Sequence, residues 1–311
     1  MILAITHEGD EEATPVLEAL ARRGAEVAVL DLGELPGRAA LALRYGGVGG
    51  PTSLRLASGR VVRAEAVEAV WWRRTRPFVL HPGLSSRDAG FAERQTSEAV
   101  EGFFASLPAR FVNDPWRDRV ASHKPLQLAA AEAVGLAVPA TLITNDPDQA
   151  RAFVAGLAGA PIIHKALHAT PVDWHPTRLL EGAERDRLDA VRLAPVILQA
   201  YVPGVDVRVL AVGPHLFAAE IDARRSRVPE DFREVYQDCP VRPVELPDGV
   251  AAGLRAVMTR LGLAYGAFDL RRRDDGAHLF LEVNPSGLWR FVEERTGQPI
   301  TEAIATLLLG R

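Results

Sequence analysis

A polar turn between two alternating segments constrains the fold of this chain more than any other feature. Residues 268–270 (Phe-Asp-Leu) precede the run 271–276, which ends in Asp-Gly, and residues 280–285 (Phe-Leu-Glu-Val-Asn-Pro) follow it. Asp-Gly favours a tight turn, and alternating apolar and polar residues are typical of strands. We therefore predict a β-hairpin in which Glu282 and Asn284 share one face and Asp269 lies roughly opposite Glu282.

Such a hairpin would bring three hard oxygen ligands to one side of a sheet, namely Asp269, Glu282 and Asn284. Mg²⁺ prefers a few carboxylates and fills its remaining positions with water or substrate phosphates. The pattern therefore indicates a magnesium site that works together with a phosphate substrate. The alternative from the residues alone is a hairpin that carries ordinary surface acids.

Composition excludes several classes of protein. The 311 residues suggest two or three domains, and a net charge of -4 gives no reason to expect nucleic-acid binding. The single cysteine, Cys239, fits a reducing cytoplasm. Residues 1–6 predict a first strand rather than a signal peptide, and no apolar run is long enough for a membrane span, so we expect a cytoplasmic protein without a membrane partner.

The opening of the chain predicts a parallel sheet. A strand at 2–6, a helix that ends at Gly24 and a strand at 27–30 form a βαβ pattern without a G-x-G-x-x-G motif. Residues 46–50, four of them glycine, are expected to be a flexible connection. A further strand at 67–72 places Arg73 and Arg74 at its carboxyl end, where α/β sheets gather binding groups.

The remaining chain predicts two α+β parts. The boundaries are expected at 1–115 for the N-terminal α/β domain, 116–195 for the central part and 196–311 for the C-terminal part. Within the last part, residues 205–221 are predicted to form a hairpin. Residues 223–243 are polar and irregular, and they are expected to form a mobile loop.

Further residues fit a phosphate site, although each has an ordinary alternative. Lys124 begins an Ala-rich helix and Lys165 ends an apolar strand, but a lone lysine is more often solvated. Ala200 and Val202, two apart at the end of a strand, could turn backbone groups toward an adenine edge, or belong to a core strand. Asp206 and Arg208 share a strand face, which suits phosphate binding or a surface ion pair.

The order of these elements resembles that of the ATP-grasp ligases over about residues 113–310. Three segments are also similar to the graspetide (microviridin-type) macrocyclases, the ATP-grasp maturases of ribosomal peptides: 70–74 (Val-Trp-Trp-Arg-Arg), 123–146 and 282–287 (Glu-Val-Asn-Pro-Ser-Gly). The resemblance implies a mixed α/β and α+β ATP-grasp fold of three domains, with ATP held between the central and C-terminal domains.

The resemblance also implies roles for individual residues. Lys124 and Lys165 would contact ATP phosphates, and Arg208 would be catalytic, near the transferred phosphate or the substrate carboxylate. Two Mg²⁺ would be held by Asp269, Glu282 and Asn284. Besides the two lysines, the resemblance implies that five further residues bind the nucleotide: Gln199, Ala200, Tyr201, Val202 and Asp206. Residues implied for substrate are Arg73, Arg74, Asp231 and Arg233, although Phe232 replaces the Trp of the family's Asp-Trp-Arg segment.

The implied activity is carboxylate activation. A Glu or Asp side chain of a ribosomally made precursor peptide would become an acyl phosphate, and a hydroxyl or amine would close an ester or amide ring. The family also implies a homodimer. The alternatives are another ATP-grasp ligase, such as a glutamate ligase that joins amino acids to a protein, and a non-catalytic ATP-binding protein.

Overall fold

The computed structural model describes residues 1–47, 49–168 and 175–310, which form two compact units. The first unit comprises Met1–Trp116 with Pro299–Arg311, and the second comprises Arg117–Gln298. In the described ranges, no helix has both the length and the apolar character that crossing a bilayer requires.

The first unit is built on a parallel sheet of order β2-β1-β6-β7. Its strands are β1 (Ile2–Ile5), β2 (Val27–Leu30), β6 (Ala69–Trp72) and β7 (Arg110–Val112), and its helices are α1 (Ala13–Arg22), α2 (Ser86–Ser106) and α9 (Ile300–Leu309). Parallel pairing of β1 with β2 and β6 confirms the predicted βαβ opening. α1 connects β1 to β2 and α2 connects β6 to β7, so the chain returns to the same end of the sheet and these strands run parallel.

A small antiparallel sheet, absent from the sequence prediction, completes this unit. Its strands are β3 (Ala40–Ala42), β4 (Ser53–Arg55) and β5 (Val61–Arg63). The glycine-rich stretch at 46–50 lies between β3 and β4, and residue 48 of it falls outside the described residues. The segment that the sequence predicted to be a connection thus joins β3 to β4, which pair with each other.

The C-terminal helix packs in the first unit rather than in the second. α9 lies against α1, where Arg22 and Arg23 pair with Glu302, and Arg110 of β7 donates a hydrogen bond to the Leu308 carbonyl over 2.7 Å. The predicted C-terminal domain runs from residue 196 to residue 311. In the structure, residues 299–311 belong instead to the first compact unit. The division into three domains stays a prediction.

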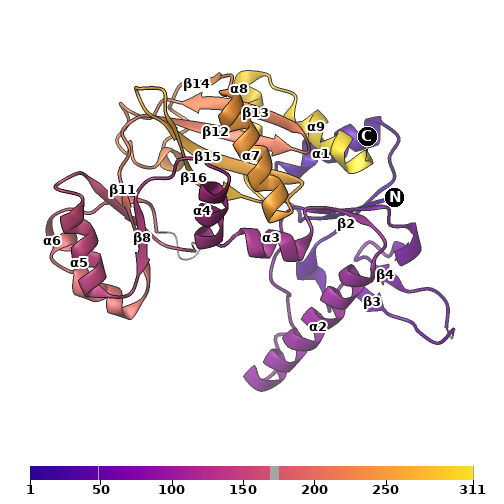
Figure 1. Ribbon diagram of the computed structural model, residues 1–311. Helices are drawn as coiled ribbons and strands as arrows, with labels where there is room; N and C mark the ends of the chain where they lie inside the picture. Colours follow the sequence, from indigo (N-terminus) through magenta and orange to yellow (C-terminus); the bar gives the residue numbers. More distant parts are fainter. Residues whose placement is uncertain (48, 169–174, 311) are drawn as a thin grey trace. The chain divides into compact units, whose positions relative to one another are not determined.

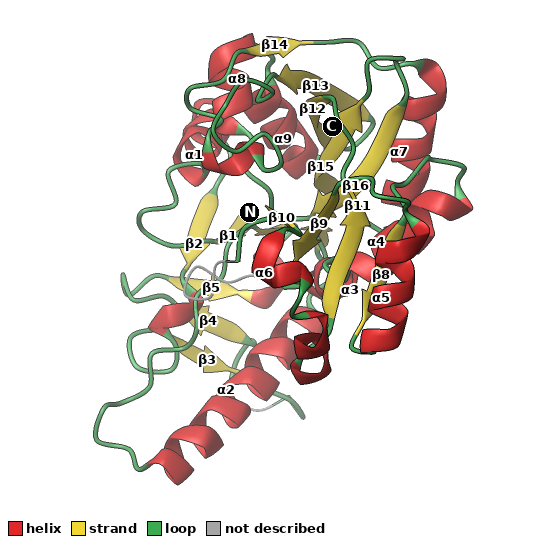
Figure 2. Cartoon of the chain, turned by 90° about the vertical axis from the view of Figure 1, so that its left-hand side faces the viewer, coloured by secondary structure: helices red, strands yellow, loops and turns green. Residues whose placement is uncertain are grey.

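The second unit contains a smaller antiparallel sheet of order β10-β9-β11-β8. Its strands are β8 (Thr141–Thr144), β9 (Ile162–Lys165), β10 (Arg178–Leu179) and β11 (Val196–Ala200), and its helices are α5 (Pro147–Gly156) and α6 (Gly182–Arg185). Figure 2 shows α5 lying along β8. Ala150 and Val154 of α5 pack on Ile162 and Leu198, so the helix covers one face of β9 and β11.

A five-stranded antiparallel sheet of order β14-β13-β12-β15-β16 forms the rest of the second unit. Its strands are β12 (Val205–Val212), β13 (His215–Ile221), β14 (Val241–Pro243), β15 (Tyr265–Arg272) and β16 (His278–Asn284). The helices are α3 (Pro115–Ala121), which spans the boundary between the units, α4 (Lys124–Ala133), α7 (Asp248–Leu261) and α8 (Arg290–Thr296). α4 and α7 pack side by side on one face of this sheet (Figure 1).

Strand alternation gives the two faces of this sheet different chemistry. Val207 and Val209 of β12 and Phe268 of β15 point into the apolar core beneath α4 and α7. The alternate positions of the same strands, including Asp206 and Asp269, therefore point to the opposite face. That face is the one on which the sequence predicted a site.

The hairpin β15–β16 contains a bulge next to that face. Asp269 pairs with Glu282, as predicted, but Leu270 pairs with Phe280, so the register shifts by one residue. The extra residue lets Phe280 and Val283, three apart, both enter the core while Glu282 stays on the polar face. Simple alternation in the sequence does not reveal this shift.

The segment expected to be a mobile loop is packed around an apolar cluster of its own. Within 223–243, β14 and a short 3-10 helix at Phe232–Glu234 are ordered structure. Val228, Phe232, Val235 and Cys239 are buried together, and Phe291 of α8 packs against them. The polar composition of the segment conceals these apolar residues, which lie three or four positions apart and pack with Ile221 of β13.

Candidate active site

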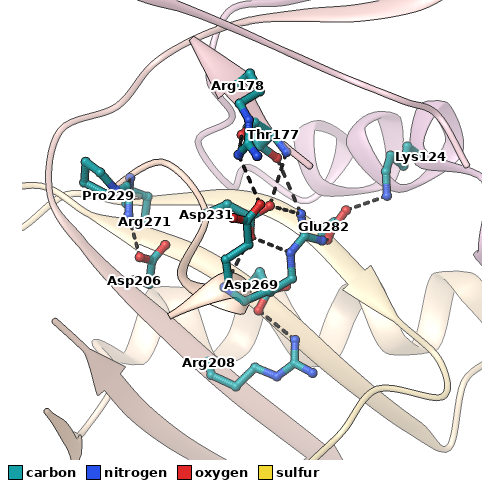
Figure 3. Close-up of polar contacts among 12 residues, drawn as sticks. Lys124, Thr177, Arg178, Asp206, Arg208, Pro229, Asp231, Asp269, Arg271 and Glu282 are labelled. Carbon is teal, nitrogen blue, oxygen red and sulfur yellow. Dashed lines mark hydrogen bonds and ion pairs between the residues drawn. The ribbon is translucent and has the colours of Figure 1, made fainter. Parts of the chain in front are cut away.

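The polar face of the five-stranded sheet carries two cross-strand ion pairs. Arg208 of β12 lies opposite Asp269 of β15, and Asp206 lies opposite Arg271. The Arg208 Nη1 to Asp269 Oδ1 distance is 2.7 Å, and Arg271 Nη1 lies 2.6 Å from Asp206 Oδ2 (Figure 3). All four residues are at most 6% exposed. Because each charge is buried, each needs its partner.

Glu282 lies beside these pairs, and two cations from other elements hold its carboxylate. Lys124 Nζ, at the start of α4, lies 2.5 Å from Glu282 Oε2, and Arg233 Nη1 lies 3.1 Å from Oε1. Figure 3 shows the approach of Lys124 to Glu282 from the side of α4. Both oxygens of the predicted metal ligand therefore face positive charge.

Opposite influences act on the two facing carboxyl groups. Burial alone would raise the pKa of Glu282, but Lys124 and Arg233 outweigh it and hold that pKa well below its ordinary value. Burial raises the pKa of Asp269 despite Arg208, and the charge of Glu282 adds to the rise. The site thus favours negative charge on Glu282 and would gain from further positive charge near Asp269.

The carboxylate pair fits a divalent ion that is shared with phosphates. Asn284 is exposed, and its Oδ1 accepts the Ser286 amide over 2.9 Å. Among the described residues there is no group of three or more His, Cys, Asp and Glu side chains suited to a metal. The carboxylates of Asp269 and Glu282 and the side-chain amide of Asn284 would fill only some of the octahedral coordination positions of Mg²⁺. The remaining positions would be open to nucleotide phosphates and water.

The strand end predicted to border adenine lies at the same site. The Ala200 amide donates to the Ala140 carbonyl over 2.9 Å, so an outside contact from Ala200 would use its carbonyl oxygen. The Val202 carbonyl accepts from Arg271 Nε over 2.9 Å, so Val202 would offer its amide. One acceptor and one donor two residues apart match the edge of adenine.

Lys165 and Gln199 lie on neighbouring strands of the smaller sheet. Lys165 Nζ is 3.3 Å from Gln199 Oε1, and Gln199 Nε2 donates to Thr141 Oγ1 over 2.8 Å. Burial and the cations Lys124 and Arg233 lower the pKa of Lys165. A phosphate placed near these cations would relieve their mutual repulsion.

One pocket collects most of the predicted nucleotide and metal residues. It encloses about 50 Å³, and the predicted residues in its lining are Lys165, Gln199, Ala200, Tyr201, Val202, Asp206, Asp231, Arg233, Asp269 and Glu282. Ligand sites for small molecules usually measure about 300–1,000 Å³. Entry of a nucleotide therefore requires side chains such as Arg233, which crosses to Glu282, to move.

The four residues predicted to contact substrate have different surroundings. Arg73 is 3% exposed and lies 3.4 Å from Glu12 and 3.7 Å from Asp10, which favours a structural role, whereas Arg74 is exposed. Asp231 is buried, and its two carboxylate oxygens accept hydrogen bonds from Nε and Nη2 of Arg233, each over 2.7 Å. Substrate contact by any of them stays a prediction.

Sequence reasoning missed two residues of this site. Arg271 was assigned only to the polar turn run 271–276, but it lies on β15, is 4% exposed and binds Asp206, Val202 and Pro229. Its position two residues after Asp269 places it on the same strand face, a signal that was present in the sequence. Gln127, buried in α4, also escaped notice.

The chain matches a family model and solved structures. Residues 1–119 match the model described as "MvdD pre-ATP grasp domain". Macrocyclase MdnC from Microcystis aeruginosa MRC, solved with its precursor peptide MdnA, is 25% identical and covers 100% of this chain and 99% of its own, with a TM-score of 0.89. The chain has the fold of the ATP-grasp ligases. The mixed α/β class and the resemblance to the graspetide macrocyclases inferred from the motifs are thereby confirmed.

Two further comparisons bear on chemistry. ATP-grasp ligase PsnB, solved with a phosphomimetic variant of a minimal precursor, Mg and ADP, is 26% identical over 99% of this chain and 97% of its own, with a TM-score of 0.79. A probable α-L-glutamate ligase of Hahella chejuensis is 27% identical over 200 residues, 62% of this chain. This chain spans 62% of the length of that curated relative.

Proposed function

We propose that this protein is an ATP-dependent carboxylate ligase that closes ester or amide rings in a ribosomally made precursor peptide. The observation that carries the proposal is the polar sheet face, where Arg208, Asp269 and Glu282 lie together beside Lys124. The pocket at this face is also lined by the end of β11 and the two residues after it, the hinge strand end (residues 200–202, the hinge). Solved relatives that match the whole chain hold a precursor peptide, or a precursor with Mg and ADP.

In this account the protein supplies position and charge rather than a covalent nucleophile. Ala200 and Val202 border the adenine, while Lys124 and Lys165 approach the phosphates. A substrate carboxylate attacks the γ-phosphate of ATP, ADP leaves, and an acyl phosphate forms on the peptide. A hydroxyl or amine of the same peptide then attacks the acyl carbon and releases phosphate. Preorganised charge is the main source of rate in such transfers.

Arg208 is the residue best placed to assist the transfer. Its Nη1 and Nη2 are bound to Asp269 and the Leu288 carbonyl, and among the described residues its buried Nε has no hydrogen-bond partner. An unpaired buried donor gains from an anionic acceptor. Asp269, Glu282 and Asn284 would hold magnesium, proposed as two ions, which when bound offsets the triphosphate charge.

The second candidate is a ligase that adds glutamate to an acceptor. Its support is the similarity to probable α-L-glutamate ligases, which reaches 31% identity over 191 residues for the Klebsiella pneumoniae (strain 342) relative. That match covers 59% of this chain, whereas the macrocyclase match covers 100% and the pre-grasp model covers residues 1–119. The N-terminal unit therefore favours the macrocyclase. We also propose a cytoplasmic homodimer, by family resemblance.

Trapping the activated carboxylate tests the proposal. The protein is incubated with ATP, Mg²⁺, a candidate precursor peptide and hydroxylamine, which intercepts acyl phosphates as hydroxamates. The account predicts hydroxamates at Glu or Asp side chains of the peptide. Hydroxamate at the C-terminal carboxyl group of the peptide, with none on its Glu or Asp side chains, would favour the second candidate. ATP binding without any hydroxamate would favour a protein that binds ATP without turnover.

A further inference from the structure

Arg271 joins three separate segments of the candidate nucleotide pocket. Its Nε donates to the Val202 carbonyl over 2.9 Å, and Nη1 to Asp206 Oδ2 over 2.6 Å. Its Nη2 donates to the Pro229 carbonyl over 2.8 Å. Figure 3 shows Arg271 between Asp206 and Pro229. One guanidinium therefore connects the hinge strand end, β12 and the segment around Pro229.

The contact with Val202 decides which backbone group the hinge presents. Because Arg271 takes the Val202 carbonyl, the amide of Val202 is the group left for a ligand. The Ala200 amide is already bound to Ala140, so Ala200 offers its carbonyl. Adenine carries an amino donor beside a ring acceptor, whereas guanine carries a carbonyl acceptor beside a ring donor. The arrangement accepts the first base and opposes the second.

Arg271 also holds the aromatic residue of the hinge. Its guanidinium carbon lies 5.4 Å from the centroid of the Tyr201 ring, within the range of a cation–π contact. Tyr201, Val202, Asp206 and Arg271 all line the same pocket. The guanidinium thus contacts the backbone of the hinge on one side and its ring on another.

We propose that Arg271 is a positioning residue that sets the preference of this protein for ATP over GTP, an inference that rests on the proposed function. It acts through the Val202 backbone and does not touch the reacting atoms. Only a planar fork with several donors reaches the two carbonyls and the carboxylate together, so lysine cannot replace it.

The test measures nucleotide affinity rather than turnover. Calorimetric dissociation constants for ATP and GTP, each with Mg²⁺ and without peptide, are compared for wild type, Arg271→Lys and Arg271→Gln. The matched control is Arg272→Lys, since Arg272 neighbours Arg271 on β15 but pairs with Glu220 over 2.5 Å. Thermal unfolding verifies that each variant is folded.

The account predicts that both Arg271 variants bind ATP about tenfold more weakly and lose about tenfold of the ATP preference, whereas the control matches wild type. Folded Arg271 variants with unchanged preference would overturn the inference and leave the proposed function intact. A wild-type protein that binds neither nucleotide would refute the proposed function itself.

A measurement on the wild-type protein keeps the inference testable if both Arg271 variants fail to fold. The backbone amide of Val202 is followed by nuclear magnetic resonance as ATP or GTP is added with Mg²⁺. ATP should shift this amide and protect it from exchange, and GTP should not. Bound ATP that leaves the Val202 amide unchanged would contradict the proposed orientation.

Discussion

Gln127 and Val283 are joined by two reciprocal hydrogen bonds between a side chain and a strand. Gln127 Nε2 donates to the Val283 carbonyl over 2.7 Å, and the Val283 amide donates to Gln127 Oε1 over 3.1 Å. The same Nε2 donates to the Ala121 carbonyl over 2.7 Å. Gln127 therefore serves as a partner for the edge strand β16 directly beside Glu282.

Replacing Gln127 should destabilise the second unit. Gln127→Leu leaves the buried backbone groups of Val283 and Ala121 without partners, so we expect the free energy of unfolding to fall by about 2–4 kcal/mol. Urea denaturation measures the loss. Gln149→Leu on α5 is the control, because Gln149 is exposed. Equal effects of the two changes would contradict the assigned role of Gln127.

The missing side chain of Gly287 leaves room for the Arg208 guanidinium. A Cβ on Gly287 would lie 2.3 Å from the Ala267 Cβ and 2.8 Å from Arg208 Nη2. Gly287→Ala should therefore cost about 1–3 kcal/mol of unfolding free energy and displace the Arg208 guanidinium. Gly249→Ala is the control, since no atom lies within 4 Å of a Cβ there. Thermal denaturation of both variants checks the prediction, which fails if Gly287→Ala is as stable as wild type.

Arg208 should contribute to turnover more than to nucleotide binding. We expect Arg208→Gln to lower the rate of peptide-dependent ADP formation by about 100-fold or more, because a positioned charge near the transferred phosphate is lost. The ATP dissociation constant should change far less. Arg255→Gln is the control, as Arg255 is exposed and its Nε donates to the Pro214 carbonyl, away from the polar sheet face. A parallel loss of binding and rate would place Arg208 in nucleotide binding instead.

Asp206 should make stability depend on pH. Burial raises its pKa to about 7, Asp269 and Asp231 add to the rise, and Arg271 opposes it. Between the ordinary value of 3.8 and about 7, the native state then binds one more proton than the unfolded chain. The stabilising contribution is full below the ordinary pKa and is lost as pH rises through 7, at up to about 1.4 kcal/mol per pH unit.

Denaturation of wild type and Asp206→Asn at pH values between about 5 and 8 tests this linkage. The stability of wild type relative to the variant should fall as pH rises across that interval and then level off. Parallel curves would show that the pKa of Asp206 is the same in the folded and unfolded states.

Short-range patterns predicted much of this site. The facing pair Asp269 and Glu282 follows from alternation around an Asp-Gly turn, and both strands were located in advance. The shared faces of Asp206 with Arg208 and of Glu282 with Asn284 follow from the period of a strand. These features depend on neighbours within a few residues, so one sequence is enough to infer them.

Long-range packing explains what the sequence did not reveal. The bulge after Asp269 depends on which residues the core beneath α4 accepts, and the burial of Arg271 depends on Val202 and Pro229. The three strands β3, β4 and β5 have three residues each, too few to show a period. Arg73 ended a predicted strand correctly, but its acidic neighbours at 10 and 12 become visible only in the folded unit.

Mass spectrometry of a candidate precursor peptide is the most direct test of the central claim. The peptide is incubated with the protein, ATP and Mg²⁺, and in parallel with Glu282→Gln. The account predicts that the peptide loses the mass of one water for each bond formed, and that the variant leaves it unchanged. An unchanged peptide with active wild type, or an equal loss with Glu282→Gln, would contradict ring closure at this site.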